Sequence, residues 1–204
     1  MGWYSSYVFP RLCEFGLNNH RVAAHRSTLL QDARGEILEI GIGSALNAAH
    51  YPSHVRRITA IDPNPGMHRW AAARIAETGL EVDKRILSSE SLPFADESFD
   101  CVVSTFTLCS IADVHQALGE VYRVLRPGGA FLFLEHGLSP DPGVARWQRR
   151  LNGLERLLAD NCHLDRSVRE LVAGQPFAKV EIDEFYLPKT PRTHGYFSRG
   201  QGIK

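Results

Sequence analysis

The stretch Glu36-Ile37-Leu38-Glu39-Ile40-Gly41-Ile42-Gly43 decides the fold of this 204-residue chain. Its apolar part predicts a buried strand over 36–40, and the Gly-x-Gly that follows predicts a tight turn in which a ligand can approach the backbone closely. Asp62 stands 21 residues after Gly41, at the end of the next predicted strand, 57–61. The turn and the acid are therefore expected at one edge of a sheet, where a carboxylate can accept hydrogen bonds from both hydroxyls of a ribose.

Strand and helix patterns alternate from residue 36 to residue 137. Asn64-Pro65 and Asp113, with Gln116 three residues later, predict the starts of two helices. Continuous apolar strands between helices are typical of a parallel sheet covered on both faces. The chain is therefore predicted to be an α/β protein. Further strands are predicted at 82–87, 99–106, 130–134, 180–185 and 196–203.

One domain is expected over 1–204, because the length suits a single core. It divides into a helical segment at 1–34, a core of alternating strands and helices at 35–137, and a segment at 138–204 with one helix and the closing strands. Apolar residues at steps of three and four from Val144 to Leu158 predict the helix of that last segment. On this stripe Trp147 is expected in the core rather than in a ligand pocket.

Composition excludes several classes of function. The 23 Lys+Arg balance 23 Asp+Glu, so no basic footprint for nucleic acid or for a membrane surface is expected. No apolar run is long enough to span a bilayer, and the start of the chain lacks the pattern of a signal peptide. The four cysteines have no Cys-x-x-Cys spacing, which predicts reduced thiols in the cytoplasm and no zinc site.

The glycine turn by itself leaves two other functions open. A nicotinamide-dependent oxidoreductase would carry Gly-x-Gly-x-x-Gly/Ala, but Leu46 occupies the third position. Glu39, two residues before the first glycine, suits a ligand with an ammonium group and disfavours a pyrophosphate. A module that binds such a ligand without catalysis is the second alternative.

Four segments resemble the class I S-adenosylmethionine-dependent methyltransferases, in the order and spacing of that family. A finer likeness, in 107–110, 134–136 and 195–204, is to thiol S-methyltransferases and to ubiquinone- or phospholipid-type enzymes. The resemblance implies a Rossmann-like, mostly parallel seven-stranded sheet with an antiparallel last strand, and an N-terminal helical lid. It implies S-adenosylmethionine as cofactor and S-adenosylhomocysteine as product. The four segments are 38–43, 61–65, 92–100 and 124–129.

The resemblance also implies which residues hold the cofactor. Glu39 lies near its ammonium group, Asp62 holds the ribose, and Pro63 or Asn64 flanks the adenine. Ala45 departs from the family, where many members have a third glycine. The nine residues carried over are Glu39, Gly41, Gly43, Asp62, Pro63, Asn64, Ser89, Glu90 and Thr105.

The remaining roles implied for these residues are contacts through the backbone. Ser89 and Glu90 offer backbone groups to the adenine, and Thr105 offers its carbonyl to the ammonium. Ser88 stands where many members have an aspartate for the adenine amino group.

His136 is the candidate catalytic residue. It follows the fifth predicted strand, and a thiol acceptor with a pKa of about 8.5 needs a base or a cationic neighbour to become a thiolate at neutral pH. Cys109 is expected to be a small buried side chain. The nine histidines show no metal-ligand spacing, so no metal is expected. The acceptor is predicted to be a small, fairly apolar molecule: a thiol first, then a quinone or phenol, then a phospholipid amine.

Overall fold

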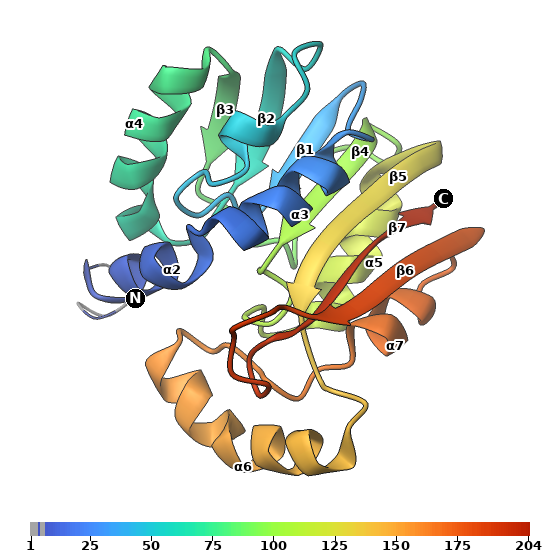
Figure 1. The fold of residues 1–204 in the computed structure, drawn as a ribbon. Coiled ribbons are helices and arrows are strands. Elements are labelled where there is room, and N and C mark those ends of the chain that lie inside the picture. The colour runs from blue at the N-terminus through green and yellow to red at the C-terminus, as the bar shows by residue number, and fades with distance from the viewer. Residues whose placement is uncertain (1–3, 5–6) are drawn as a thin grey trace.

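A seven-stranded sheet forms the centre of the protein, in the order β3-β2-β1-β4-β5-β7-β6 (Figure 1). The structure is a computed structural model that describes residues 4 and 7–204, the side chains of Phe9, His68 and Arg69 excepted. The predicted α/β fold is confirmed: β1 to β5 pair in parallel, and the last strand, β7, pairs antiparallel with β5 and β6. The strands are β1 Ile37–Ile40, β2 Arg57–Ile61, β3 Glu81–Arg85, β4 Phe99–Thr105, β5 Leu125–His136, β6 Lys179–Tyr186 and β7 Tyr196–Ile203.

The order of strands reverses at β1. The chain moves outward from β1 to β2 and β3, and then returns to pair β4 on the other side of β1. Ligands of open α/β sheets bind outside the carboxyl ends of the strands at such a switch point. The loops after β1, β2 and β4 therefore meet where a ligand is expected.

Helices cover both faces of the sheet and bury two apolar cores. α3 (His20–Leu30) and α4 (His68–Thr78) pack on one face, and α5 (Val114–Val124) and α7 (Val168–Ala173) pack on the other. Side chains alternate along a strand, so Ile37 contributes to the first core and Leu38 and Ile40 to the second. All four residues of β1 are buried, as expected for a central parallel strand.

Side-chain caps precede two helices at the residues that the sequence predicts. The Asp113 carboxylate accepts a hydrogen bond from the Gln116 N–H (3.0 Å) and caps α5. The Asn64 side chain accepts from the Gly66 N–H (2.9 Å), and a 3₁₀ turn at Pro65–Met67 leads into α4. These contacts set the entry angles of two helices that follow the loops of the switch point.

Strand β5 is longer than the predicted 130–134. Its first part contains Pro127-Gly128-Gly129, residues that are more typical of the end of a helix than of a strand. The Gly128 N–H donates to the carbonyl of Lys204 (2.8 Å), and the Lys204 N–H donates to the carbonyl of Gly129 (3.0 Å). The carboxyl-terminal residue thus pairs with this stretch and extends the strand, a long-range contact that no local pattern shows.

Two helices lie beyond the carboxyl ends of β4 and β5 (Figure 1): α2 (Phe9–Leu17) and α6 (Pro142–Leu158). Helix α6 forms as predicted, but the expectation that Trp147 lies in the core is wrong: its side chain is 55% exposed, and Leu154 is exposed to the same extent. The helix is held by Gln148 instead, which is fully buried and donates to the carbonyls of Gly137 and Thr193 (both 3.0 Å).

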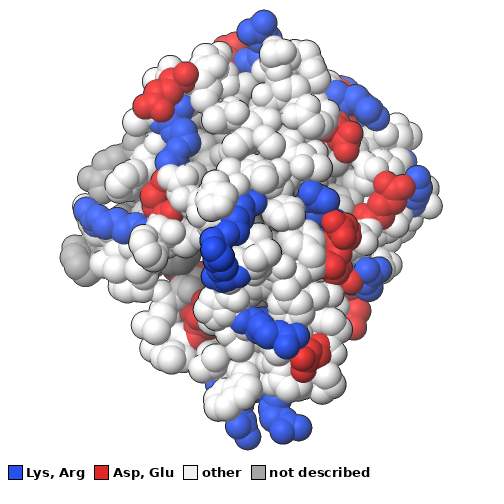
Figure 2. All heavy atoms as spheres, in the orientation of Figure 1, with Lys and Arg blue, Asp and Glu red and all other residues white. Residues whose placement is uncertain are grey.

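The surface carries both signs of charge. Figure 2 shows Lys and Arg side chains interspersed with Asp and Glu side chains over one face of the protein. None of the described helices combines the length and the apolar character needed to cross a lipid bilayer.

Gly200, in β7, tests how tightly the closing strands pack on the sheet. A Cβ at this position would meet the carbonyl oxygen of Glu181 in β6 and the Phe133 ring (Cζ at 2.9 Å). Gly200→Ala should therefore lower the free energy of unfolding by about 1–3 kcal/mol, as overpacking does. Gly119→Ala, at an exposed position of α5 with open space around the new methyl group, should raise it by about 1 kcal/mol. Urea unfolding of both variants measures the two effects, and equal signs would contradict the packing described here.

Candidate active site

The nine residues carried over for the cofactor line one cavity of about 410 Å³ at the carboxyl ends of β1, β2 and β4. The structure thus brings together segments that span residues 39 to 105. The direct contact of each residue with a cofactor stays a prediction. His136 lies outside this cavity and lines a second one.

The glycine turn is shaped for close approach to the backbone. Gly41 and Gly43 have φ angles of +69° and +54°, in the left-handed region that favours glycine. A Cβ on Gly41 would collide with the side chain of Thr107 in the loop after β4. Ala45 also has a positive φ, +60°, and is fully buried. The chain thus keeps the backbone conformation of a third glycine, at a cost of about 1–2 kcal/mol for an alanine.

Asp62 joins the glycine turn to the end of β2. Its Oδ2 accepts from the Gly43 N–H (2.8 Å), and its Oδ1 accepts from the Asn64 N–H (2.7 Å). Burial raises the pKa of this carboxyl, although the two hydrogen bonds act to lower it. Each carboxylate oxygen has a second lone pair, so Asp62 can accept from ribose hydroxyls while it holds the turn.

Glu39 is buried on β1 beside the same cavity. Its two oxygens accept from the Asn47 side-chain amide (2.9 Å) and from the Tyr51 hydroxyl (2.7 Å). Burial raises its pKa to about 7. The nearby Arg26 guanidinium and the two hydrogen bonds oppose this rise, so they favour the charged form that an ammonium group requires.

Arg26, on α3, is a site residue that sequence reasoning missed. Its side chain is 3% exposed, lines the cofactor cavity, and donates from Nη1 to Asn47 Oδ1 and to Thr105 Oγ1 (both 2.7 Å). Its Nε has no hydrogen-bond partner among the described residues. Burial lowers its pKa only to about 10, so the side chain stays charged at neutral pH. A buried, charged donor without a partner is the chemistry that receives an anionic group.

Ser88, Ser89 and Glu90 form the far end of the cavity. The Ser88 hydroxyl donates to a carboxylate oxygen of Glu90 (2.9 Å), and the other oxygen accepts from the Asp113 N–H (2.6 Å). These contacts tie the loop after β3 to the start of α5. The backbone groups of Ser89 and Glu90 are thereby fixed at the cavity, which is what their predicted role needs.

A second cavity of about 440 Å³ adjoins the first. Its walls are mainly apolar, and four residues line both cavities: Cys13, Leu17, Phe106 and Ser110. Phe106 has a φ angle of +55°, a strained value for a bulky residue. Its ring packs against Phe197 (centroids 5.2 Å apart) and lies 5.1 Å from the Arg26 guanidinium carbon. The strained backbone therefore puts an aromatic ring between the two cavities.

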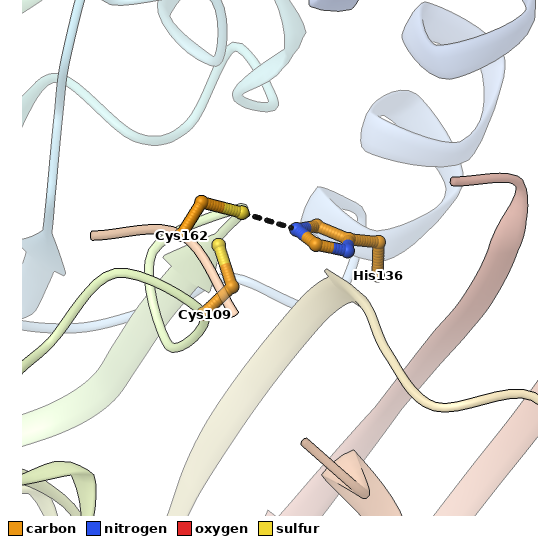
Figure 3. A group of neighbouring side chains, drawn as sticks. All are labelled: Cys109, His136 and Cys162. Carbon is orange, nitrogen blue, oxygen red and sulfur yellow. Dashed lines mark hydrogen bonds between the residues drawn. The ribbon is translucent and has the colours of Figure 1, made fainter. Parts of the chain in front are cut away.

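Three side chains from distant parts of the sequence meet in the wall of this second cavity (Figure 3): Cys109 from the loop after β4, His136 from the end of β5, and Cys162 from the loop after α6. The His136 Nε2 lies 3.1 Å from the Cys162 sulfur. Figure 3 shows both sulfur atoms on the same side of the imidazole ring. Sequence spacing could not have found this trio, because 26 residues or more separate its members.

The charges of the three side chains are coupled. A hydrogen bond from Cys162 and the nearby His136 lower the pKa of Cys109, against the effect of burial. Burial opposes the charged form of His136, but the Cys109 sulfur outweighs it and raises the pKa of the imidazole. The pKa of Cys162 is raised, because its thiol donates to Cys109 and is buried. His136 thus favours the charged form of Cys109, and the Cys109 sulfur favours the charged form of His136.

Glu135 fixes the loop that carries Cys109. This carboxylate is fully buried, and it accepts from the Ser104 hydroxyl (2.7 Å) and from the Thr107 N–H (2.9 Å). Burial raises its pKa to about 8. Because Glu135 precedes His136 directly, one end of β5 both holds the loop after β4 and supplies the imidazole.

Helix α2 covers the cofactor cavity from the N-terminal side, since Cys13 and Leu17 line it. Glu14 on this helix accepts from the Ser44 hydroxyl (2.8 Å) in the glycine turn and forms a salt bridge with Arg74 of α4 (2.5 Å). Burial opposes ionisation, but these partners outweigh it and lower the pKa of Glu14. The first part of the predicted lid, residues 1–3 and 5–6, lies outside the described residues.

Comparison with known proteins identifies the family. The methyltransferase-domain family matches residues 38–133. Human thiol S-methyltransferase TMT1A is 35% identical over 169 residues, which cover 78% of this chain and 69% of that protein. The chain belongs to the S-adenosylmethionine-dependent methyltransferases. A second relative of this methyltransferase is phosphatidylethanolamine N-methyltransferase of Cereibacter sphaeroides. The two are 29% identical, and the match covers 79% of this chain and 77% of that protein.

The fold of the methyltransferase matches solved structures of the same family. An S-adenosylmethionine-dependent methyltransferase from Thermotoga maritima, titled a possible histamine N-methyltransferase, superimposes with a TM-score of 0.69. The match covers 98% of each chain at 21% identity, so it concerns the fold alone. Matches to four human and rodent thiol S-methyltransferases cover 62–72% of the length of those proteins.

The cofactor cavity fits S-adenosylmethionine, the cofactor of this family. A Cβ at Gly43 would stand in nearly open space on the cavity wall, so a ligand can approach the backbone there, and the Nε of Arg26, which has no partner among the described residues, suits the carboxylate of the methionine half. Glu39 suits the ammonium of the same half. Charges of both signs are therefore available at one end of the cavity.

Glu14 tests whether α2 retains the cofactor. Glu14→Gln removes a charged partner from Arg74 and should raise the dissociation rate of S-adenosylhomocysteine by roughly 5–30-fold, the factor for 1–2 kcal/mol. In the parent protein this contribution should disappear as the pH falls through the lowered pKa of Glu14. Stopped-flow displacement measures the rate, with exposed Glu81→Gln as the control. An unchanged rate in Glu14→Gln would contradict a retaining role for α2.

Proposed function

We propose that this methyltransferase methylates a small, apolar thiol. The observation that carries the proposal is the second cavity: its walls are mainly apolar, it shares Phe106 with the cofactor cavity, and its polar wall contains His136 beside two cysteines. The name of a relative, thiol S-methyltransferase, supports the same acceptor. Burial of its apolar part in such a cavity would stabilise a bound thiol, and its sulfur would lie against the polar wall with His136 and the two cysteines.

The other two acceptors fit this cavity less well. A phenol has a reference pKa of about 10, against about 8.5 for a thiol, so it needs more help to ionise at neutral pH. An amine headgroup carries positive charge and is best received by a free carboxylate. Glu155 lines the cavity, but it already has His194 as a partner (3.4 Å), which lowers the pKa of Glu155.

Different residues of the chain would bind different parts of the cofactor. When bound, S-adenosylmethionine supplies an electrophilic methyl group on a sulfonium. Arg26 and Glu39 would orient its methionine half, Asp62 and the glycine turn its ribose, and the backbone of Ser89 and Glu90 its adenine. Pro63 or Asn64 would flank the adenine, and the Thr105 carbonyl would accept from the ammonium. Alignment and exclusion of water are the main needs of an in-line displacement.

His136 would promote formation of the acceptor thiolate. It lines the acceptor cavity, and the Cys109 sulfur keeps its pKa above the ordinary value for an imidazole. A positive charge at this place stabilises a thiolate on an acceptor bound nearby. We therefore assign to His136 the catalytic role on the acceptor side.

The proposal also includes the compartment in which the enzyme works and the kind of acceptor that it methylates. The four cysteines are free, and Cys109 and Cys162 remain unpaired although they adjoin one another; both facts support a reducing compartment such as the cytoplasm. A net charge of zero and interspersed surface charges support a small-molecule acceptor rather than a nucleic acid.

Arg26→Gln tests the contact with the cofactor carboxylate. Loss of a charged, buried donor should weaken S-adenosylhomocysteine binding by roughly 10–150-fold. Binding of 5′-methylthioadenosine, which lacks the amino-acid half, should stay unchanged. Calorimetry with both ligands separates the two effects, and Arg21→Gln, on the same helix but outside the lining of the cofactor cavity, is the control. Equal weakening of both ligands would show a general effect on the fold rather than a carboxylate contact.

His136→Ala tests the acceptor side. It should lower kcat by roughly 10²–10³-fold at neutral pH, the range for loss of a group that stabilises a developing negative charge. The defect should shrink as the pH rises past about 8.5, where the thiol ionises unaided. A pH–rate profile with 2-mercaptoethanol at saturating cofactor measures this, and His194→Ala, in the same cavity, is the control. Parallel profiles for His136→Ala and the parent would remove His136 from the mechanism. No turnover of thiols by the parent would refute the acceptor.

A further inference from the structure

The trio of Cys109, His136 and Cys162 has the composition of a metal site. We propose that these side chains bind one zinc ion and that the acceptor thiol occupies the open fourth position of that zinc. The inference of a metal site depends only on the geometry of the trio. Its use in catalysis rests on the proposed thiol acceptor.

The ligand atoms are close enough for one ion. One ligand atom of each residue lies within 4.8 Å of the other two. Zinc bonds of about 2.3 Å to sulfur and 2.0–2.1 Å to nitrogen, at tetrahedral angles, place ligand atoms roughly 3.5–3.8 Å apart. Small rotations of the side chains therefore suffice to bring all three into the coordination sphere.

The kind of donor selects the kind of metal. Thiolates and an imidazole suit zinc and other soft or borderline ions, whereas calcium and magnesium require oxygen ligands. Two cysteines and one histidine are one of the ligand sets that catalytic zinc sites use, with the fourth position left for water or substrate. Within the part of the chain that the structure describes, no fourth His, Cys, Asp or Glu joins the trio.

The protein holds the trio in place before any metal binds. The His163 N–H donates to the carbonyl of Cys109 (2.9 Å), and the Asn161 side-chain amide donates to the carbonyl of Ser110 (3.0 Å). Arg166 adds a third contact, to the carbonyl of Leu108. The loop after β4 and the loop after α6 are thus joined on both sides of the cysteines. Such a frame reduces the entropy that metal binding must overcome.

The charges around the trio permit a dication. Zinc with two thiolates is electrically neutral, so Arg166, which lies near both sulfur atoms, does not oppose it. Cys109 and Cys162 are 5% and 8% exposed, and both line the acceptor cavity. Their burial shields the zinc–sulfur bonds from water, while the cavity gives an acceptor access to the metal.

With zinc bound, His136 is a neutral ligand, and the metal in place of the imidazolium supplies the positive charge that stabilises the acceptor thiolate. The acceptor sulfur binds zinc and its proton leaves to solvent. The sulfur then forms a bond to the methyl carbon as the bond from that carbon to the sulfonium sulfur breaks. The products are a methyl thioether and S-adenosylhomocysteine. A neutral thioether is a weak ligand, so it leaves the zinc and the site is ready again.

Zinc binding can be measured directly on the full chain, without an activity assay. Metal-free protein, prepared with a chelator, is titrated with zinc against a chromogenic competitor. We expect one zinc per chain. Cys109→Ser, Cys162→Ser and His136→Ala should each weaken binding by more than the roughly 10–100-fold that loss of an outer-shell partner costs. Cys13→Ser, in the same cavity but outside the trio, should leave the affinity unchanged. Circular dichroism confirms that each variant folds.

Cobalt reports on the fourth position. With cobalt in place of zinc and S-adenosylhomocysteine added, the protein should show a thiolate-to-cobalt charge-transfer band and the strong visible absorption of a four-coordinate ion. 2-Mercaptoethanol should intensify the charge-transfer band, and ethylene glycol, its hydroxyl counterpart, should not. A spectrum that both additives leave unchanged would overturn coordination of the acceptor.

The outcomes separate this inference from the proposed function. Absence of zinc binding, or binding that the three variants leave intact, would overturn the metal site. Undiminished methylation of 2-mercaptoethanol by the chelator-treated enzyme would overturn the role of zinc and leave the thiol acceptor standing. Zinc bound by the trio with no thiol turnover would support the site and refute the acceptor.

Discussion

A single buried carboxylate, Glu135, determines how the two halves of the site meet. It is fully buried at the end of β5, where burial raises its pKa, and its oxygens accept hydrogen bonds from Ser104 and Thr107. These bonds pull the loop after β4 against the end of β5. The loop then leaves β4 through a left-handed Phe106, whose ring lies between the cofactor cavity and the acceptor cavity.

The two cavities therefore share walls rather than merely lying near each other. Phe106, Cys13 and Leu17 line both, so movement of α2 would open both at once. Glu14 ties that helix to the glycine turn and to α4, while Gln148 fixes α6 on the other side of the acceptor cavity. The same contacts leave the apolar stripe of α6, with Trp147 and Leu154, exposed to solvent. Polar contacts, rather than apolar burial alone, thus determine how the helices at the edge of the sheet are placed.

Most of the fold could be predicted from the sequence, because its signals are local. The strand before Gly41, the cap at Asp113 and the spacing to Asp62 depend on neighbours within a few residues or on the regular geometry of a βαβ unit. The nine residues expected at the cofactor gather in one cavity for the same reason: the carboxyl ends of adjacent parallel strands meet at a single edge. The length of β5 was missed, because its first residues pair with Lys204 at the far end of the chain.

The sequence by itself determined the alternating strands and helices and the sheet edge at which the glycine turn meets Asp62, since periodicity and turn chemistry act over short distances. Only the tertiary structure decided that Arg26 is buried beside Glu39 with an Nε that none of the described residues accepts from, and that Trp147 lies outside the core. It alone brought Cys109, His136 and Cys162 together. Each of these results depends on how loops from separate elements pack, and a loop's partners are chosen by the shape and hydrogen bonds of the whole fold rather than by the residues next to it.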